Sequence, residues 1–115
     1  MVKQWNHIIV NAQEHISSVQ RRLLSGEARD PHHAANLVMI IERVKILLQD
    51  LYTQAVSSQD HFTSFHDLTI QFGLCAKLFK EMKEWSSSKE ARLVREWNKL
   101  HDMGSKIVQD ANPDT

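Results

Sequence analysis

Residues 92–104, RLVREWNKLHDMG, place Arg95 six positions before His101, and few other residues in this chain of 115 suggest chemistry. An arginine attracts phosphate groups and a histidine exchanges protons near neutral pH, so the pair raises the question of a catalytic site. Because an α-helix turns by about 100° per residue, Arg95 points about 160° away from the Trp97 indole and His101 only about 40° away from it. We expect Arg95 to lie in solvent and His101 to line the edge of the packed face.

The spacing of Arg95 and His101 resembles the arginine–histidine signature of HEPN-type ribonucleases, which are small helical bundles that dimerise to form their active site. The resemblance implies RNA cleavage by these two residues. In that family a polar residue, commonly asparagine, follows the arginine, whereas Glu96 follows it here. A carboxylate beside Arg95 weakens its attraction for a phosphate. The resemblance covers seven positions, so the sequence favours a protein with no catalytic residues and leaves the ribonuclease as a remote alternative.

Seven histidines and one cysteine raise the further question of a metal site or a thiol nucleophile. His32 and His33 are adjacent and point about 100° apart on a helix. His61 and His66 are five positions apart, which misses the i,i+4 spacing of helical ligand pairs. Cys75 falls on an apolar stripe and has no ligand near it in sequence. We expect no metal and no cofactor, histidines on the surface, and a cysteine that packs in the core.

Apolar residues recur at three- and four-residue steps in four segments, as in amphipathic helices. We expect helices at about 2–24, 31–56, 64–85 and 88–110, in one domain of residues 1–111 with a frayed tail at 112–115. Three glycines and two prolines are too few for a fold rich in tight turns. Because the connections are short, the predicted fold is an all-α, antiparallel four-helix bundle, either monomeric or dimeric.

Local signals mark the predicted helix ends. Gly26 reads as a stop, and Asp30 before a proline reads as an N-cap. Ser64 and Ser87 each stand three positions before an acidic residue, which is the spacing of a capping box, and Ser57 or Ser58 is the alternative cap for the third helix. Gly73 lies inside the third helix, where glycine costs about 1 kcal/mol relative to alanine. We expect another backbone to approach closely there.

Fourteen basic and fourteen acidic residues give no net charge, which counts against a dedicated nucleic-acid-binding protein. Residues 77–106 nevertheless hold eight basic and five acidic side chains. The candidate nucleic-acid surface, called here the basic strip, consists of Lys77, Lys80, Arg92, Arg95, Lys99 and Lys106. Ion pairs at i,i+4 spacing, such as Arg92 with Glu96, are expected to neutralise much of it.

A single cysteine cannot form an internal disulfide, and the N-terminus shows no basic-then-apolar leader. The longest apolar run, residues 37–41, is far shorter than the ~18 residues of a membrane span. We therefore expect an intracellular, cytoplasmic protein, in the host-cell cytoplasm if it is viral, with no membrane contact.

The second helix carries an apolar face wider than one stripe, and its predicted partner-binding residues are Met39, Ile40, Leu47 and Tyr52. The sequence favours a non-catalytic interaction protein of the adaptor, chaperone, inhibitor or viral or bacterial accessory type. We expect it to bind a partner protein, or itself as a homo-oligomer, through this face. The alternative is a helical dimer that binds RNA or DNA through the basic strip.

Overall fold

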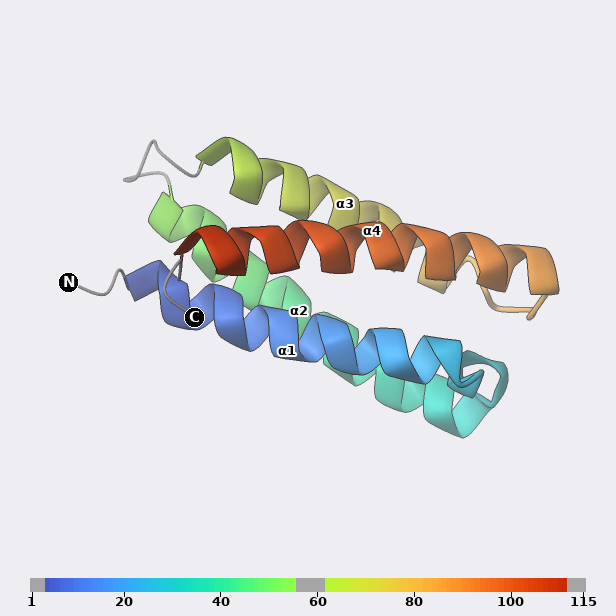
Figure 1. The fold of residues 1–115 in the computed structure, drawn as a ribbon. Helices are drawn as coiled ribbons and strands as arrows, with labels where there is room; N and C mark the ends of the chain where they lie inside the picture. The colour runs from blue at the N-terminus through green and yellow to red at the C-terminus, as the bar shows by residue number, and fades with distance from the viewer. Residues whose placement is uncertain (1–3, 56–61, 112–115) are drawn as a thin grey trace.

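The computed structural model describes residues 4–55 and 62–111, and within these ranges it contains helices and no strand (Figure 1). The helices are α1 (Gln4–Leu24), a short 3-10 helix η1 (Glu27–Arg29), α2 (Pro31–Ala55), α3 (Phe62–Lys80) and α4 (Ser87–Ala111). The four long helices pack side by side around one core, which confirms the predicted all-α four-helix bundle. None of the helices in the described ranges is long and apolar enough to cross a membrane.

Trp97 of α4 lies at the centre of the core and is fully buried. Its indole N–H donates a hydrogen bond of 2.9 Å to the backbone carbonyl of Ile16 in α1. Its ring meets that of Phe72 from α3 edge to face, with the centroids 6.4 Å apart. At the end of the bundle where α1 begins, Trp5 makes a similar contact with Phe65, at 5.2 Å. Aromatic contacts therefore join α1, α3 and α4 along the length of the core.

A row of polar contacts fixes how α1 and α4 lie against each other. Gln13 donates through its side-chain nitrogen to Ser105 Oγ and to the His101 carbonyl, both at 2.9 Å. Further along, Gln20 donates to the Asn98 side-chain oxygen at 2.8 Å. Residue numbers rise along α1 as their partners' numbers fall along α4, so the two helices run in opposite directions.

The third helix ends at Lys80, five residues before the predicted position. Its last turn tightens, because the Met82 amide donates to the Phe79 carbonyl three residues back. Leu78 is buried, whereas Phe79 and Met82, which continue the three- and four-residue spacing of the apolar residues, are only partly buried. The predicted helix is too long because the sequence contains no glycine or proline at the point where α3 ends.

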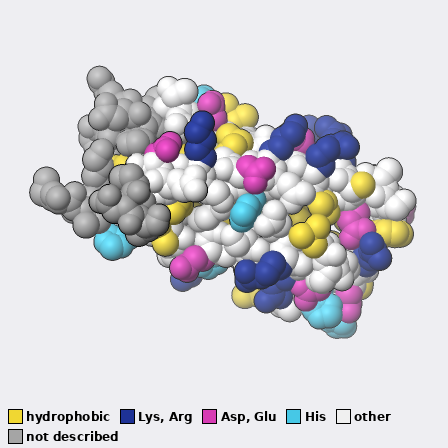
Figure 2. All heavy atoms as spheres, viewed as in Figure 1, with side chains coloured by type: hydrophobic (Ala, Val, Ile, Leu, Met, Phe, Trp, Pro, Cys, Tyr) yellow, Lys and Arg dark blue, Asp and Glu magenta, His cyan; other side chains and the backbone are white. Residues whose placement is uncertain are grey.

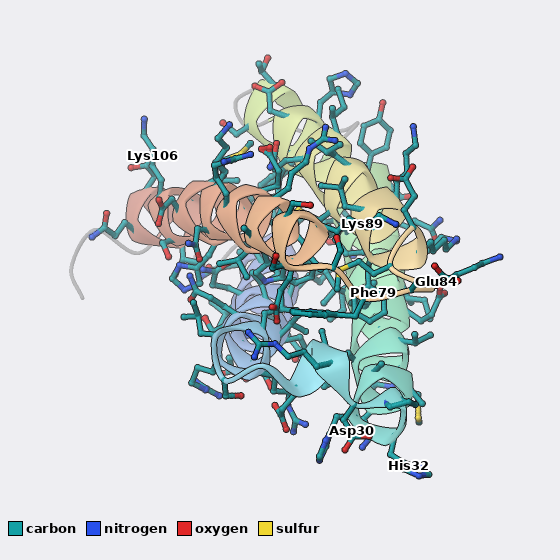
Figure 3. The ribbon with its side chains drawn as sticks, turned by 90° about the vertical axis from the view of Figure 1, so that its right-hand side faces the viewer. Asp30, His32, Phe79, Glu84, Lys89 and Lys106 are labelled. Carbon is teal, nitrogen blue, oxygen red and sulfur yellow. The ribbon has the colours of Figure 1, made fainter. Side chains whose placement is uncertain are left out.

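Because α3 ends at Lys80, the following residues place Trp85 against the start of α4. Glu90 is buried and accepts hydrogen bonds from the Trp85 indole at 3.2 Å and from Arg29 Nε at 3.0 Å. It also forms an ion pair with Arg29 Nη2 at 2.9 Å. The Arg29 guanidinium also stacks over the Trp85 ring, 5.1 Å from its centroid. These three residues, called here the Glu90 cluster, close the end of the bundle that Figure 3 views.

Two of the four predicted helix-end signals are correct. The His32 amide donates to Asp30 Oδ1 at 2.9 Å, and this hydrogen bond is the main cause that lowers the pKa of the Asp30 carboxyl. Gly26 has φ of 81°, the left-handed conformation that ends a helix at low cost for glycine. Ser64 is wrong as a cap because α3 already begins at Phe62, and the alternative caps Ser57 and Ser58 lie outside the described residues.

Ser87 is also wrong as a cap, because α4 is capped one residue earlier. The Lys89 amide donates to Ser86 Oγ at 3.2 Å. The capping-box carboxylate of Glu90 bonds instead with Arg29 and Trp85, so it is not available to the helix end.

The two glycines inside helices have opposite surroundings. Gly104 is buried where α4 meets α1, and a Cβ added there would overlap the side-chain amide of Gln13. Gly73 is exposed, and a Cβ added there would meet no atom within 4 Å. The close approach of a backbone predicted at Gly73 is therefore wrong, and the close contact at Gly104 is made by a side chain, that of Gln13.

We predict that Gly73→Ala raises the free energy of unfolding by about 0.5–1 kcal/mol, because alanine favours the helix and the site is open. Gly104→Ala displaces Gln13 from two hydrogen bonds of about 1 kcal/mol each, which offsets that gain. Urea denaturation should rank Gly73→Ala above Gly104→Ala. In a Gln13→Ala background, Gly104→Ala should become stabilising. Equal stabilisation by both alanine substitutions in the native background would show that the Gln13 side chain can move aside without lowering the free energy of unfolding.

Candidate functional site

An open groove runs between α2 and α3, with a volume of about 260 Å³. Its floor is apolar and its rim is polar. The apolar lining residues are Val38, Ile41, Leu48, Phe72, Ala76 and Phe79, together with Gly73. The polar lining residues are Glu42, Lys45, Gln49, Thr69 and Lys80.

Small residues on α3 keep this groove open. Gly73 has no side chain and Ala76 has only a methyl group, and both face α2 across the groove. On the opposite wall, Val38 remains 45% exposed. Phe79 closes the floor near the end of α3, and Figure 3 shows it between α3 and α2. Apolar surface is therefore exposed to solvent here at Val38 and in part at Ala76 and Phe79.

The predicted partner-binding residues of α2 do not share one face. Met39 is 72% exposed, whereas Ile40 and Leu47 are partly buried against the core. Ile40 faces α1, since it lines a shallow hollow with residues of that helix. Tyr52 faces α3, where its ring lies 6.2 Å from that of His66. The wide apolar face is divided in this way because α2 packs against two neighbouring helices.

The sequence did not reveal the groove residues as a site because their pattern is that of a core stripe. Ile41, Leu48 and Phe72 are indeed buried, and they also form the groove floor. The signal that could have indicated an opening is the pair of small residues, Gly73 and Ala76, three positions apart on the α3 face that meets α2.

All six residues of the basic strip are exposed, and the structure separates them into two groups. Arg92, Arg95, Lys99 and Lys106 lie on the side of α4 opposite Trp97. Lys80 instead lines the groove, on the flank of α3 that faces α2, and Lys77 lies on the outer surface of the same helix. Figure 2 shows lysine and arginine side chains gathered over α3 and the first half of α4, and Figure 3 shows Lys106 projecting away from α2.

The expected neutralisation of the basic strip is mostly missing. Among residues 4–55 and 62–111, the one ion pair made by the strip joins Lys99 to Glu96, at 3.2 Å and i,i+3 spacing. The hydrogen bond from Lys99 holds the pKa of the Glu96 carboxyl below its usual value. Arg92, Arg95 and Lys106 make no ion pair within the part of the chain that the structure describes.

Arg95 and His101 lie as the helical geometry predicted. Arg95 is exposed, and His101 is partly buried against α1, with its Nε2 3.1 Å from Ser17 Oγ. The two side chains leave α4 in directions about 120° apart. The structure therefore does not bring this pair to a common site.

No group of three or more histidine, cysteine, aspartate or glutamate side chains in the described ranges is placed to hold a metal ion. His33 contacts Asp30, with Nδ1 3.1 Å from Oδ2, and His32 is exposed beside it. His61 lies outside the described residues.

Cys75 is fully buried, as predicted. Burial, and after it the nearby Glu96 carboxylate, raises the pKa of its thiol to about 12, while a hydrogen bond with Gln71 opposes both. Because the thiolate is the reactive form of cysteine, this environment makes Cys75 inert near neutral pH.

Comparison of the chain with models of protein families, with curated proteins and with solved structures finds no match. The geometry of the groove and of the basic strip is therefore the basis for assigning a function.

We predict that Cys75 resists alkylation by iodoacetamide in the native protein at about pH 8, because only about one thiol in ten thousand is ionised at that pH. Labelling should be at least about a hundredfold faster in urea, where the pKa falls back and the side chain is exposed. Mass spectrometry of a Ser88→Cys variant supplies the control, since residue 88 is exposed and should label at once. Rapid native labelling of Cys75 would contradict its burial.

Proposed function

We propose that the chain is a non-catalytic binding protein that captures an amphipathic helix of a partner protein in the groove between α2 and α3. The observation that supports this proposal is the apolar floor that faces solvent between two helices. Residues 38–49 of α2 line the groove over about 16 Å, or three helical turns. A partner helix lying there would bury side chains at i, i+4, i+7 and i+11.

The size of the groove favours side chains of a partner over a small molecule. Pockets that enclose drug-sized ligands measure about 300–1,000 Å³ and bury most of the ligand. The groove measures about 260 Å³ and is open along its length. It therefore fits a few apolar side chains carried on a helix that lies across it.

The residues of the groove also favour binding over catalysis. Glu42, Lys45 and Lys80 are its titratable residues, and all three are exposed at the rim. None of the residues that line it is a histidine, a cysteine or a serine, the usual general bases and nucleophiles. The groove presents apolar contact area and charge, which are the means by which a protein recognises an amphipathic helix.

We predict that filling the groove abolishes helix capture. The probe is a fluorescein-labelled synthetic peptide of about 18 residues with leucine at i, i+4, i+7 and i+11 and polar residues elsewhere. Gly73→Phe places a ring in the open space above Gly73 and should weaken peptide binding at least about tenfold in fluorescence anisotropy. Gly73→Ala is the matched control, because a methyl group leaves most of the groove open.

Circular dichroism should show that both variants remain helical. A scrambled peptide of the same composition should bind weakly to all three proteins. Unchanged binding by Gly73→Phe, or no preference for the amphipathic peptide over the scrambled one, would contradict capture in this groove.

A second candidate function is the binding of RNA or DNA along α4. The observation that favours it is the exposure of Arg92, Arg95 and Lys106 without ion pairs in the described ranges. These residues and Lys99 follow one side of α4 over about 21 Å, so they can contact successive phosphates.

We predict for this candidate that affinity for a single-stranded RNA oligonucleotide falls steeply between ~50 and ~200 mM salt. Replacing Arg92, Arg95 and Lys99 together by glutamine should remove most of that affinity and flatten the salt dependence. Capture of the leucine peptide by the same triple variant should be unchanged. Equal RNA retention by the native protein and the triple variant would show that the strip is an ordinary solvated face.

A further inference from the structure

We infer that the groove selects its partner helix by charge: the helix carries acidic residues on both flanks of its apolar stripe, and these meet Lys45 on α2 and Lys80 on α3. This inference rests on the proposed function, because it names the chemistry of the helix that the groove receives. It assigns roles in specificity to two residues whose positions on opposite walls of one groove are not evident from the sequence.

The two lysines stand on opposite walls of the groove and are both exposed. Neither makes an ion pair with any residue in 4–55 or 62–111. Glu42 precedes Lys45 by three positions on α2, a spacing that permits an ion pair, whereas Glu84 lies beyond the end of α3. The rim thus presents two cations that make no ion pair within the described ranges, against one anion, Glu42.

The helix dipole explains only part of this arrangement. Lys80 is the last residue of α3, where a cation is favoured by the negative end of the helix. Lys45 lies in the middle of α2, where the dipole gives no such preference. It lines the apolar groove and is nevertheless exposed. A ligand with negative charge beside an apolar surface accounts for both positions.

The positions of Lys45 and Lys80 along the groove indicate the spacing of the acidic residues on the partner helix. The Tyr52 ring lies beside the His66 ring, and α2 and α3 run in opposite directions (Figure 1). Because Tyr52 and His66 are neighbours, residues equally far from them along the two helices lie level with each other. Val38 is fourteen residues before Tyr52 and Lys80 is fourteen residues after His66, so these two residues are level. Lys45 is seven residues further along, or about 10 Å. The partner helix therefore carries its two acidic groups on opposite flanks, about two turns apart.

A second copy of this chain fits the rim less well than an acidic partner. The exposed apolar residues on the outer side of α2 are Met39 and Ile46. Glu42, Arg43 and Asp50 flank these two residues on the same side of the helix, so this stripe offers the two lysines one acidic group in excess instead of two. Charge complementarity therefore favours a helix from a different protein.

The test uses two peptides with the same leucine stripe, one with glutamate and one with lysine at the two flanking positions. Native protein at ~50 mM salt should bind the glutamate peptide about tenfold more tightly, and the preference should shrink at ~500 mM salt. Lys45→Glu/Lys80→Glu should reverse the preference. The matched control, Lys99→Glu/Lys106→Glu, changes the net charge equally on the outer side of α4 and should keep the native preference.

The outcomes separate the two proposals. If neither peptide binds, or if Gly73→Phe fails to weaken the glutamate peptide, the proposed function fails and this inference fails with it. If both peptides bind equally and Lys45→Glu/Lys80→Glu changes nothing, the groove captures helices but the inference is overturned. Reversal by the α4 control as well would also overturn it, because net charge alone would then explain the preference. A dimer in light scattering that Gly73→Phe dissociates would identify a second copy as the occupant, with the same consequence.

Discussion

The hydrogen bond from the Trp97 indole to the Ile16 carbonyl sets the arrangement on which the remaining contacts depend. It lies in the dry core, where leaving a donor unpaired costs about 1–3 kcal/mol, so α4 is held at one height against α1. At that height Gln13 meets Ser105, and Ser17 meets His101. The same ring packs against Phe72, which places α3. The α2–α3 groove lies on the opposite flank of Phe72, where Gly73 and Ala76 leave the helices apart.

Features of the fold that arise within one helix were predictable from the sequence. The inner stripes follow from periodicity alone, so Ile9, Leu48 and Trp97 are buried as expected. The cap at Asp30 follows from its side chain and the proline behind it. The end of α3 was not predictable, because it depends on contacts that Trp85 makes outside this helix. Arg29, which is remote in sequence, stacks on the Trp85 ring, and Glu90, which lies in the next helix, accepts its hydrogen bond.

The candidate site was harder to predict, because a groove is a property of two helices and of the distance between them. Helical geometry alone separated Arg95 from His101. The same geometry could not show which apolar residues of α2 pack against α1 and which pack against α3. Ile40 and Tyr52 were therefore assigned to one face, although they turn towards α1 and α3 respectively. Whether Gly73 allows a close contact or leaves a groove likewise depends on the neighbouring helix α2, so the sequence of α3 alone does not decide it.

The Glu90 cluster has a consequence for recognition at the far side of the molecule. Arg29 stands two residues before the start of α2, and Trp85 follows the end of α3, so their stacking holds those two helix ends at a fixed separation. The walls of the groove are thus preorganised at this end, and a helix bound there, as proposed above, would lose less free energy to the ordering of its receptor.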